Sequence, residues 1–290
     1  MAQILNGKEV SQLIIQKLAE ESLAFKKPPC LAVILVGDDP ASGVYVSGKE
    51  QACKKAGFRS VVIREKKSIS SKKLLAMIYD LNKDRSINGI LCQLPLPGHI
   101  EEQTVINAID PLKDVDCFHP YNLGRLLAGS PVILPCTPAG IIGLLEHYNI
   151  NLTGKNCAVI GRSNIVGKPL SLLLTMKNAT VTLCHSRTEN LKKIILGSDL
   201  IFAAIGKPEF IKGDMIKKGA VVIDVGINRV EAPSAPRGFR LLGDVEYEKA
   251  GRKASYITPV PGGVGPMTIA MLLKNTMDLF RLQKKNKNHK

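Results

Sequence analysis

The stretch "VIGRSNIVGKPL", residues 159–170, decides how the second half of this chain folds. An apolar strand runs into Gly161, and Gly167 follows where a helix begins. In a nucleotide-binding turn, glycines let the backbone approach phosphate, and the helix N-terminus supplies N–H groups. The usual middle glycine is absent, because Arg162 and Ser163 stand in its place. Spacing alone therefore also suits a plain turn between a strand and a helix.

The next strand indicates which nucleotide such a loop prefers. An NAD site usually carries an acid about 20 residues further on, bonded to the ribose 2′-hydroxyl. Here the strand ends in "CHSRT" (184–188), which contains no acid. Ser186 can hydrogen-bond a 2′-phosphate that an acid would repel, and Arg162 can reach the same phosphate from the first loop. The two loops together predict an NADP site.

Outward from this loop, apolar strands alternate with helices along the whole chain. Continuous apolar strands separated by helices indicate parallel sheets covered on both faces, so we expect an α/β fold. The expected strands lie at 31–37, 60–65, 87–97, 157–160, 180–184, 199–205 and 220–225.

Helix boundaries are also readable. One helix is expected to start after Asp39 and Pro40, and another at Thr137, a good N-cap followed by proline, which carries the chain into a second unit. Residues 1–18 are typical of an amphipathic helix, with no signal-peptide pattern. The last helix has its apolar stripe at Ile269, Leu272, Leu273, Thr276 and Phe280.

The formal net charge is +15, and five Lys and Arg in the last ten residues form a basic tail that we expect to be disordered. A basic balance suits nucleic acid or small molecules with phosphates or carboxylates, or has no specific meaning. Tryptophan is absent, as are zinc-finger and common RNA-binding patterns, so we expect no nucleic-acid partner. No run of 18 apolar residues predicts a membrane span.

Seven cysteines are scattered without a C-x-x-C pair, and their number is odd. This usage indicates reduced thiols in a cytosolic protein, with neither a zinc site nor a disulfide framework. Five dispersed histidines add nothing in favour of a metal.

Ten segments, spread over nearly the whole chain, give it a family resemblance. They are "VGDDPASGVYVSGKEQACKKAGF" (36–58), "GILCQLPLP" (89–97), "DPLKDVDCFHP" (110–120), "PCTPAGI" (135–141), "VIGRSNIVGKP" (159–169), "CHSRT" (184–188), "AAIGKP" (203–208), "VIDVGIN" (222–228), "GDV" (243–245) and "TPVPGGVGPMT" (258–268). The chain resembles the bifunctional methylenetetrahydrofolate dehydrogenase/cyclohydrolase family. It departs from that family at Cys117, where glycine is common.

The resemblance implies a catalytic, folate-binding three-layer α/β domain over 1–138, joined by a returning helix at 267–283. It implies a Rossmann-like NADP-binding domain over 139–266, with 284–290 as the basic tail. A homodimer is implied as well, and the cysteine usage described above predicts that it is cytoplasmic. The implied reactions are oxidation of 5,10-methylenetetrahydrofolate to the methenyl form and hydrolysis of that product to 10-formyltetrahydrofolate.

Tyr45 and Lys49 stand four apart on one helix face, a spacing that is also typical of an ordinary amphipathic edge. The resemblance implies that Lys49 is the general acid/base of hydrolysis and that Tyr45 orients the folate. It assigns Gln93, otherwise a solvent-facing strand end, to hydrogen bonds with that lysine and the substrate. Asp116, otherwise a loop residue, would bind the amino-pyrimidine edge of the pterin.

The loop at 258–268 is rich in glycine and proline, a composition that also suits a rigid loop capping a helix. The resemblance implies that its backbone approaches the folate or the cofactor, through Pro261, Gly262, Gly263 and Gly265. It also implies that Ile227 contacts the nicotinamide side of the cofactor, and that Gly161, Arg162 and Ser163 bind its pyrophosphate.

Two other readings compete with this one. A shikimate-type NADP-dependent dehydrogenase also has a basic residue after the second nucleotide strand, but it favours a loop richer in glycine than "GRSNIVG". A basic nucleic-acid-binding protein explains the charge, but it does not explain Lys49, Gln93 or the NADP signature.

Overall fold

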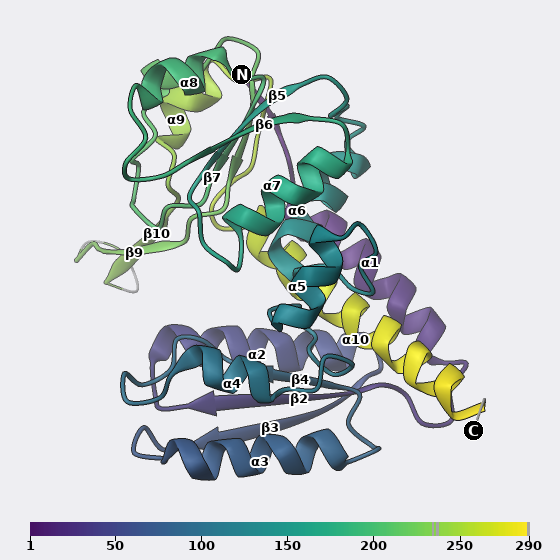
Figure 1. Ribbon diagram of the computed structural model, residues 1–290. Coiled ribbons are helices and arrows are strands. Elements are labelled where there is room, and N and C mark those ends of the chain that lie inside the picture. Colours follow the sequence, from purple (N-terminus) through teal and green to yellow (C-terminus); the bar gives the residue numbers. More distant parts are fainter. Residues whose placement is uncertain (234, 236–237, 289–290) are drawn as a thin grey trace. The chain divides into compact units, whose positions relative to one another are not determined.

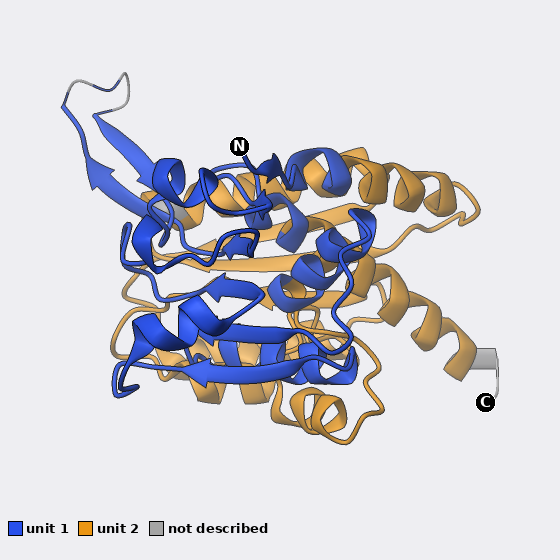
Figure 2. Ribbon diagram, turned by 90° about the horizontal axis from the view of Figure 1, so that it is seen from above, with its two compact units in different colours: residues 1–11, 137–268 blue, residues 12–136, 269–290 orange. Residues whose placement is uncertain are grey.

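The computed structural model describes residues 1–233, 235 and 238–288. The chain forms two compact units, called unit 1 and unit 2 (Figure 2). Unit 1 contains residues 1–11 and 137–268, and unit 2 contains residues 12–136 and 269–290. Each unit has its own parallel sheet, which confirms the predicted two-part α/β fold.

Unit 2 is built on a three-stranded parallel sheet. Strand β2 (Cys30–Val36) lies between β3 (Arg59–Glu65) and β4 (Gly89–Cys92). Every residue of β2 is apolar and buried, as expected of a strand covered on both faces. The predicted strands at 31–37 and 60–65 are confirmed, whereas only residues 89–92 of the predicted third strand are extended into the sheet.

Helices α2 (Pro40–Lys55) and α3 (Ser71–Lys83) cover opposite faces of this sheet (Figure 1). Alternate side chains of β2 belong to the core on the α3 side, because neighbouring strand residues point to opposite faces. Helix α4 (Glu102–Ala108) adds Val105 to the same core. Helix α5 (Pro120–Leu127) follows in the chain.

The start of α2 is fixed by its cap. The Asp39 carboxylate accepts a hydrogen bond of 2.7 Å from the backbone N–H of Ser42, and Pro40 is the first helical residue. The predicted start is therefore confirmed. Because α2 begins shortly after β2 ends, its first turns lie near the carboxyl edge of the unit 2 sheet.

Unit 1 has six parallel strands in the order β1-β11-β8-β7-β5-β6. The strands are β1 (Gln3–Ile4), β5 (Asn156–Ile160), β6 (Thr180–Cys184), β7 (Leu200–Ala203), β8 (Val221–Asp224) and β11 (Tyr256–Ile257). The direction of winding reverses at β5, which has β6 on one side and β7 on the other. Open α/β sheets bind ligands at such a switch point, outside the carboxyl ends of the strands.

Helices lie on both faces of the unit 1 sheet. Helices α8 (Leu191–Gly197) and α9 (Tyr247–Gly251) join one core cluster with β5, β7 and β8. Helix α7 (Gly167–Met176) lies on the other side (Figure 1).

The remaining elements of the two units are α1 (Gly7–Ser22), α6 (Cys136–His147), the 3₁₀ turn η1 (Gly213–Met215), α10 (Val264–Asn288), and the antiparallel strands β9 (Asn228–Glu231) and β10 (Phe239–Leu242).

The structure of the two chain ends differs from the predicted domain boundaries and from the predicted disordered tail. Residues 1–11 belong to unit 1, because β1 pairs with β11 and Leu5 is fully buried. The disorder predicted for 284–290 is wrong for 284–288, which continue α10, and residues 289–290 lie outside the described residues. Helix α6 begins at Cys136, one residue before the predicted N-cap Thr137. No helix in the described part of the chain is both long and apolar enough to cross a membrane.

Candidate active site

Two predicted catalytic side chains in unit 2 contact each other. The Nζ atom of Lys49 donates a 2.8 Å hydrogen bond to Oε1 of Gln93. Lys49 lies on α2 and keeps only 9% of its surface exposed. Gln93 directly follows β4, and its own amide nitrogen donates to the carbonyl oxygen of Leu94 at 2.6 Å. The glutamine is thereby oriented with its oxygen toward the lysine.

Asp116 lies at the same edge of the sheet. Asp114 forms a parallel bridge with Ile90 of β4, so the chain that continues to Asp116 runs alongside β4 toward Gln93. Burial raises the pKa of Asp116, while the positive charge of Lys49 opposes this shift. The lysine and this carboxyl group are therefore electrostatic neighbours, as the predicted site requires.

Tyr45 is one turn before Lys49 on α2. Its side chain is 36% exposed, and partial burial raises the pKa of its hydroxyl. A half-covered ring one turn from the lysine leaves an apolar face on which a flat heteroaromatic ring can stack. Tyr45, Lys49, Gln93 and Asp116 thus all belong to unit 2.

Cys117 has a backbone conformation that suits glycine. Its φ angle is +62°, in the left-handed region, and its side chain is fully buried. Its thiol lies 3.5 Å from the carbonyl oxygen of Ile133. A side chain in this region costs about 1–2 kcal/mol. The departure from the family pattern therefore keeps the turn after Asp116 but strains it.

In unit 1, the loop after β5 is closely packed around two glycines. A Cβ atom on Gly161, whose φ is +122°, would lie 2.1 Å from the carbonyl oxygen of Ala204. A Cβ atom on Gly167 would lie 1.9 Å from the carbonyl oxygen of Gly161. The first glycine lets the ends of β5 and β7 approach, and the second lets α7 pack against the strand end, as the glycines of a nucleotide-binding turn do.

The two remaining loop residues have different surroundings. The Ser163 hydroxyl accepts from the backbone N–H groups of Val166 at 3.1 Å and Gly167 at 3.3 Å, so it covers the N-terminus of α7. Arg162 is exposed, and in the described part of the chain its guanidinium has no hydrogen-bond or ion-pair partner. It remains available to an anion.

The turn after β6 lies beside this loop, because the N–H of Gly161 donates to the carbonyl oxygen of Cys184 at 2.9 Å. His185 closes the turn by donating its N–H to the Thr188 hydroxyl at 2.8 Å. Ser186 is left exposed in the turn. The two residues predicted to read a 2′-phosphate, Arg162 and Ser186, therefore follow adjacent strands.

The glycine-rich loop after β11 also belongs to unit 1. The backbone carbonyl of Gly262 accepts from the N–H of Lys8 at 2.9 Å, and a Cβ atom on Gly7 would lie 1.8 Å from the Gly263 carbonyl oxygen. The start of α1 thus packs directly on this loop. A Cβ atom on Gly265 would lie 3.5 Å from the Ile227 side chain, which is 40% exposed.

The remaining residues of the predicted site, Pro261 and Gly262, also belong to unit 1. Pro261 is exposed and Gly262 is half-buried, in the loop that holds Gly265. The contacts that these residues, Ser163 and Ile227 make with folate or cofactor remain predictions.

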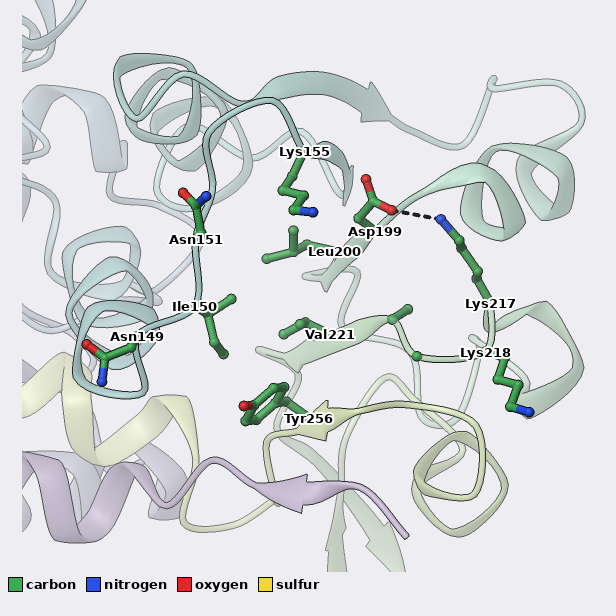
Figure 3. A pocket seen from close by; sticks show the side chains of 12 residues that line it. Asn149, Ile150, Asn151, Lys155, Asp199, Leu200, Lys217, Lys218, Val221 and Tyr256 are labelled. Atoms are coloured by element: carbon green, nitrogen blue, oxygen red, sulfur yellow. Dashed lines mark hydrogen bonds and ion pairs between the residues drawn. The ribbon is translucent and has the colours of Figure 1, made fainter.

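A hollow of about 440 Å³ lies at the opposite, amino edge of the unit 1 sheet (Figure 3). Lys155, Asp199 and Val221 line it near the starts of β5, β7 and β8, and Lys217 pairs with Asp199 at 2.7 Å. It contains none of the predicted site residues. Because α/β sheets bind ligands at the carboxyl edge, we assign the site to the loops and not to this hollow.

All seven cysteines are buried and free. Among the described residues, no three or more His, Cys, Asp or Glu side chains are grouped so that they could hold a metal ion.

Sequence reasoning missed two buried carboxylates, Asp224 and Asp244, at the carboxyl edge of the unit 1 sheet. They lie within the segments "VIDVGIN" and "GDV". A signal was available, because each aspartate has a glycine within two residues.

Comparison with known proteins defines the class to which this fold and site belong. Residues 5–116 match the family model of the tetrahydrofolate dehydrogenase/cyclohydrolase catalytic domain, and residues 135–284 match that of its NAD(P)-binding domain. The chain therefore belongs to the tetrahydrofolate dehydrogenase/cyclohydrolase family.

The chain is similar to individual relatives over nearly its full length. The chain is 55% identical to the bifunctional protein FolD of Acetivibrio thermocellus over 99% of both chains. A solved structure of the Trypanosoma brucei methylenetetrahydrofolate dehydrogenase-cyclohydrolase, complexed with NADP and an inhibitor, is 38% identical. It covers 98% of this chain and 99% of its own, with a TM-score of 0.95.

The shikimate-type reading is not favoured by these comparisons. Shikimate dehydrogenase of Aquifex aeolicus is 15% identical, with a TM-score of 0.51 over 89% of this chain and 93% of its own. That likeness shows a shared fold and nothing more.

Proposed function

We propose that this protein oxidises 5,10-methylenetetrahydrofolate to the methenyl form with NADP and hydrolyses the methenyl form to 10-formyltetrahydrofolate. The observation that carries the proposal is the hydrogen bond between Lys49 and Gln93 beside Asp116, in a chain of this family. These three groups supply a proton carrier, a group that orients it and a carboxyl group near both.

In the first reaction, bound NADP would accept a hydride from the methylene carbon. This step needs no proton donor or acceptor from the protein. The protein's part is to hold the folate, and the ring of Tyr45 and the carboxyl group of Asp116 are suited to the flat pterin and to its amino-pyrimidine edge.

The second reaction adds water to the cationic methenyl carbon. The attacking water gives up both of its protons as its oxygen becomes the formyl oxygen. One proton goes to the ring nitrogen as the bond between that nitrogen and the carbon breaks, the other is released to solvent, and the formyl group stays on the other nitrogen. Lys49 is the proposed carrier of these protons. Lys49 accepts a proton as the neutral amine and donates one as the ammonium, and in either form an N–H of its Nζ atom can donate to the Gln93 oxygen, which orients the lysine.

The proposed preference for NADP rests on charge. Arg162 has a free guanidinium in the described part of the chain, and Ser186 is exposed at the end of the adjacent strand. Neither position carries an acid that would repel a 2′-phosphate. Both groups can donate hydrogen bonds to it, which makes NADP the favoured dinucleotide.

A coupled assay on the purified protein tests the function. The protein is incubated with 5,10-methylenetetrahydrofolate and either NADP or NAD, and NADPH, methenyl and formyl products are followed by absorbance. We expect NADP-dependent oxidation followed by loss of the methenyl product. Absence of both activities would refute the proposal, and equal rates with NAD would refute the cofactor assignment alone.

A homodimer in the cytoplasm completes the proposal. Its support is the family membership and the seven buried free thiols, which suit a reducing compartment. Sedimentation of the purified protein across a concentration series would give twice the chain mass if the homodimer assignment is right.

A further inference from the structure

Asp224 ends β8, and Asp244 follows β10. The two residues are called the carboxylate pair below, and their side chains are 3% and 0% exposed. In the described part of the chain, neither forms an ion pair with Lys, Arg or His. Buried charges need compensation, and here most of it comes from backbone N–H groups.

Asp244 binds the turn that follows β7. Its Oδ2 atom accepts from the N–H groups of Ile205 at 2.6 Å and Gly206 at 3.0 Å, and its Oδ1 atom accepts from that of Lys207 at 2.9 Å. Three consecutive backbone groups therefore converge on one carboxylate. The same Oδ1 atom accepts from the side-chain amide of Asn228 at 2.9 Å.

Asp224 binds the chain on the other side of Ile227. Its Oδ1 atom accepts from the N–H of Gly226 at 3.0 Å and from the N–H of Asp244 at 2.8 Å. Ile227 is thus flanked by Gly226, held by one carboxylate, and by Asn228, held by the other. The carboxylate pair therefore holds the backbone of Gly226 on one side of Ile227 and the side chain of Asn228 on the other.

Glycines make room for this arrangement. A Cβ atom on Gly226 would lie 2.2 Å from Oδ1 of Asp244, and a Cβ atom on Gly243 would lie 1.9 Å from Oδ2 of Asp224. The Asp244 carboxylate thus fills the space beside Gly226, two residues after Asp224, and the Asp224 carboxylate fills the space beside Gly243, directly before Asp244. Any larger residue at either position would have to displace a carboxylate.

The turn that Asp244 holds begins directly after Ala204, whose carbonyl oxygen packs against Gly161 of the phosphate loop. Both segments follow strands that flank the switch point, β5 and β7. The carboxylate pair thus joins Ile227 to the edge of the crevice where a dinucleotide of this fold class lies.

We propose that Asp244 is a positioning residue for the nicotinamide half of NADP. This inference rests on the function proposed above. Asp244 does not touch the cofactor but holds the backbone of the turn at 205–207 and the side chain of Asn228, the residue after Ile227. Arg162 and Ser186, the proposed contacts of the adenosine half, follow β5 and β6, and Asp244 does not bind them.

Two ligands distinguish binding of the nicotinamide half from binding of the adenosine half. NADP contains both, whereas 2′,5′-ADP contains the adenosine and its 2′-phosphate but no nicotinamide. Dissociation constants for each are measured by calorimetry on the parent protein, Asp244→Asn and Arg162→Ala. Asp199→Asn is the matched control, because Asp199 also accepts from a backbone N–H, that of Asn156 at 3.0 Å, but at the amino edge of the same sheet.

We expect Asp244→Asn to weaken NADP binding about tenfold or more and to leave 2′,5′-ADP binding within twofold of the parent. Arg162→Ala should weaken both probes, and Asp199→Asn neither. Parent-like NADP binding by Asp244→Asn, or an equal loss of both probes, would overturn the positioning role. If the parent binds neither probe, the proposed function itself is wrong.

Asn228→Ala covers the case in which Asp244→Asn does not fold at the assay temperature, as judged by circular dichroism. It removes one donor to Asp244 and leaves the three from the turn. A smaller loss, restricted to NADP, is expected, and parent-like binding of both probes would count against the proposal.

Discussion

The Nζ atom of Lys49 lies 2.8 Å from Oε1 of Gln93, although 44 residues separate them in the sequence. The contact exists because α2 covers one face of the parallel sheet that contains β4, and Gln93 directly follows β4 (Figure 1). Lys49, in the third turn of α2, thereby reaches the end of β4. The catalytic proposal depends on this relationship, and Asp116 extends it.

Arg162→Ala should weaken NADP binding about tenfold or more and change NAD binding little, because only NADP carries the 2′-phosphate. Dissociation constants for both dinucleotides provide the measurement. Lys177→Ala is the control. Arg162 lies in the loop before α7, whereas Lys177 directly follows the far end of that helix and pairs with Glu146 at 2.6 Å. Equal losses for the two cofactors would show that Arg162 does not recognise the 2′-phosphate.

Asp116→Ala should raise the KM for folate substrates, or abolish both activities, while NADP affinity stays near that of the parent. The reason is that Asp116 is the only proposed partner of the amino-pyrimidine edge. Steady-state kinetics and NADP calorimetry test this on the same preparation. Asp80→Ala removes an exposed carboxylate of α3 and should change neither quantity. Normal folate kinetics in Asp116→Ala would remove this residue from the site.

Cys117→Gly should be more stable than Cys117→Ala by about 1 kcal/mol, because only glycine relieves a φ of +62°. At an ordinary helical position the order reverses, since glycine is less stable than alanine by about 0.5–1 kcal/mol. Cys53, buried within α2, supplies that reference. Urea unfolding of the four variants measures the differences, and the same order at both positions would contradict strain at Cys117.

Asp224 should make folding less favourable as pH rises from about 4 to 6. Burial, and to a lesser extent the charge of Asp244, raises its pKa from 3.8 to about 6, while backbone hydrogen bonds oppose the shift. The folded state therefore retains a proton that the unfolded state loses. The stabilisation is complete below pH 3.8 and is lost as pH rises through 6, a change of at most about 3 kcal/mol.

Asp224→Asn cannot titrate, so its free energy of unfolding should fall less over that range. Urea unfolding of both proteins between pH 4 and 6.5 isolates the contribution of Asp224, because the other carboxyl groups are shared. Identical pH profiles would show that Asp224 does not titrate there.

Central strands could be predicted from sequence because a strand buried on both faces is a continuous apolar run, as β2 and residues 157–160 of β5 are. Strand β1 could not, since Gln3 and Ile4 are extended only because β11 lies beside them. The end of α10 was missed for a related reason. Residues 284–288 are all polar and carry no apolar period, yet they continue a helix already formed.

The residues of the candidate site also differ in whether the sequence alone predicts them. Gly161 and Gly167 were predictable because the backbone approach to phosphate requires glycine at fixed positions. The roles of Lys49 and Gln93 came from the family resemblance, because nothing in their spacing shows that they meet. Asp224 and Asp244 were not predicted, because a carboxylate that is bound by backbone N–H groups produces no periodic pattern in the sequence.

Lys49→Met tests the central claim most directly, because it keeps the length of the side chain and removes its proton chemistry. General acid–base help typically contributes about 10²–10⁴-fold, so hydrolysis should fall to background while hydride transfer, which needs no proton carrier, survives at least in part. Lys54→Met, an exposed lysine of the same helix, should leave both activities unchanged. The measurement is methenyl accumulation against formyl product in one reaction mixture. Accumulating methenyl product is the predicted result, and methenyl turnover at the parent rate would contradict the account.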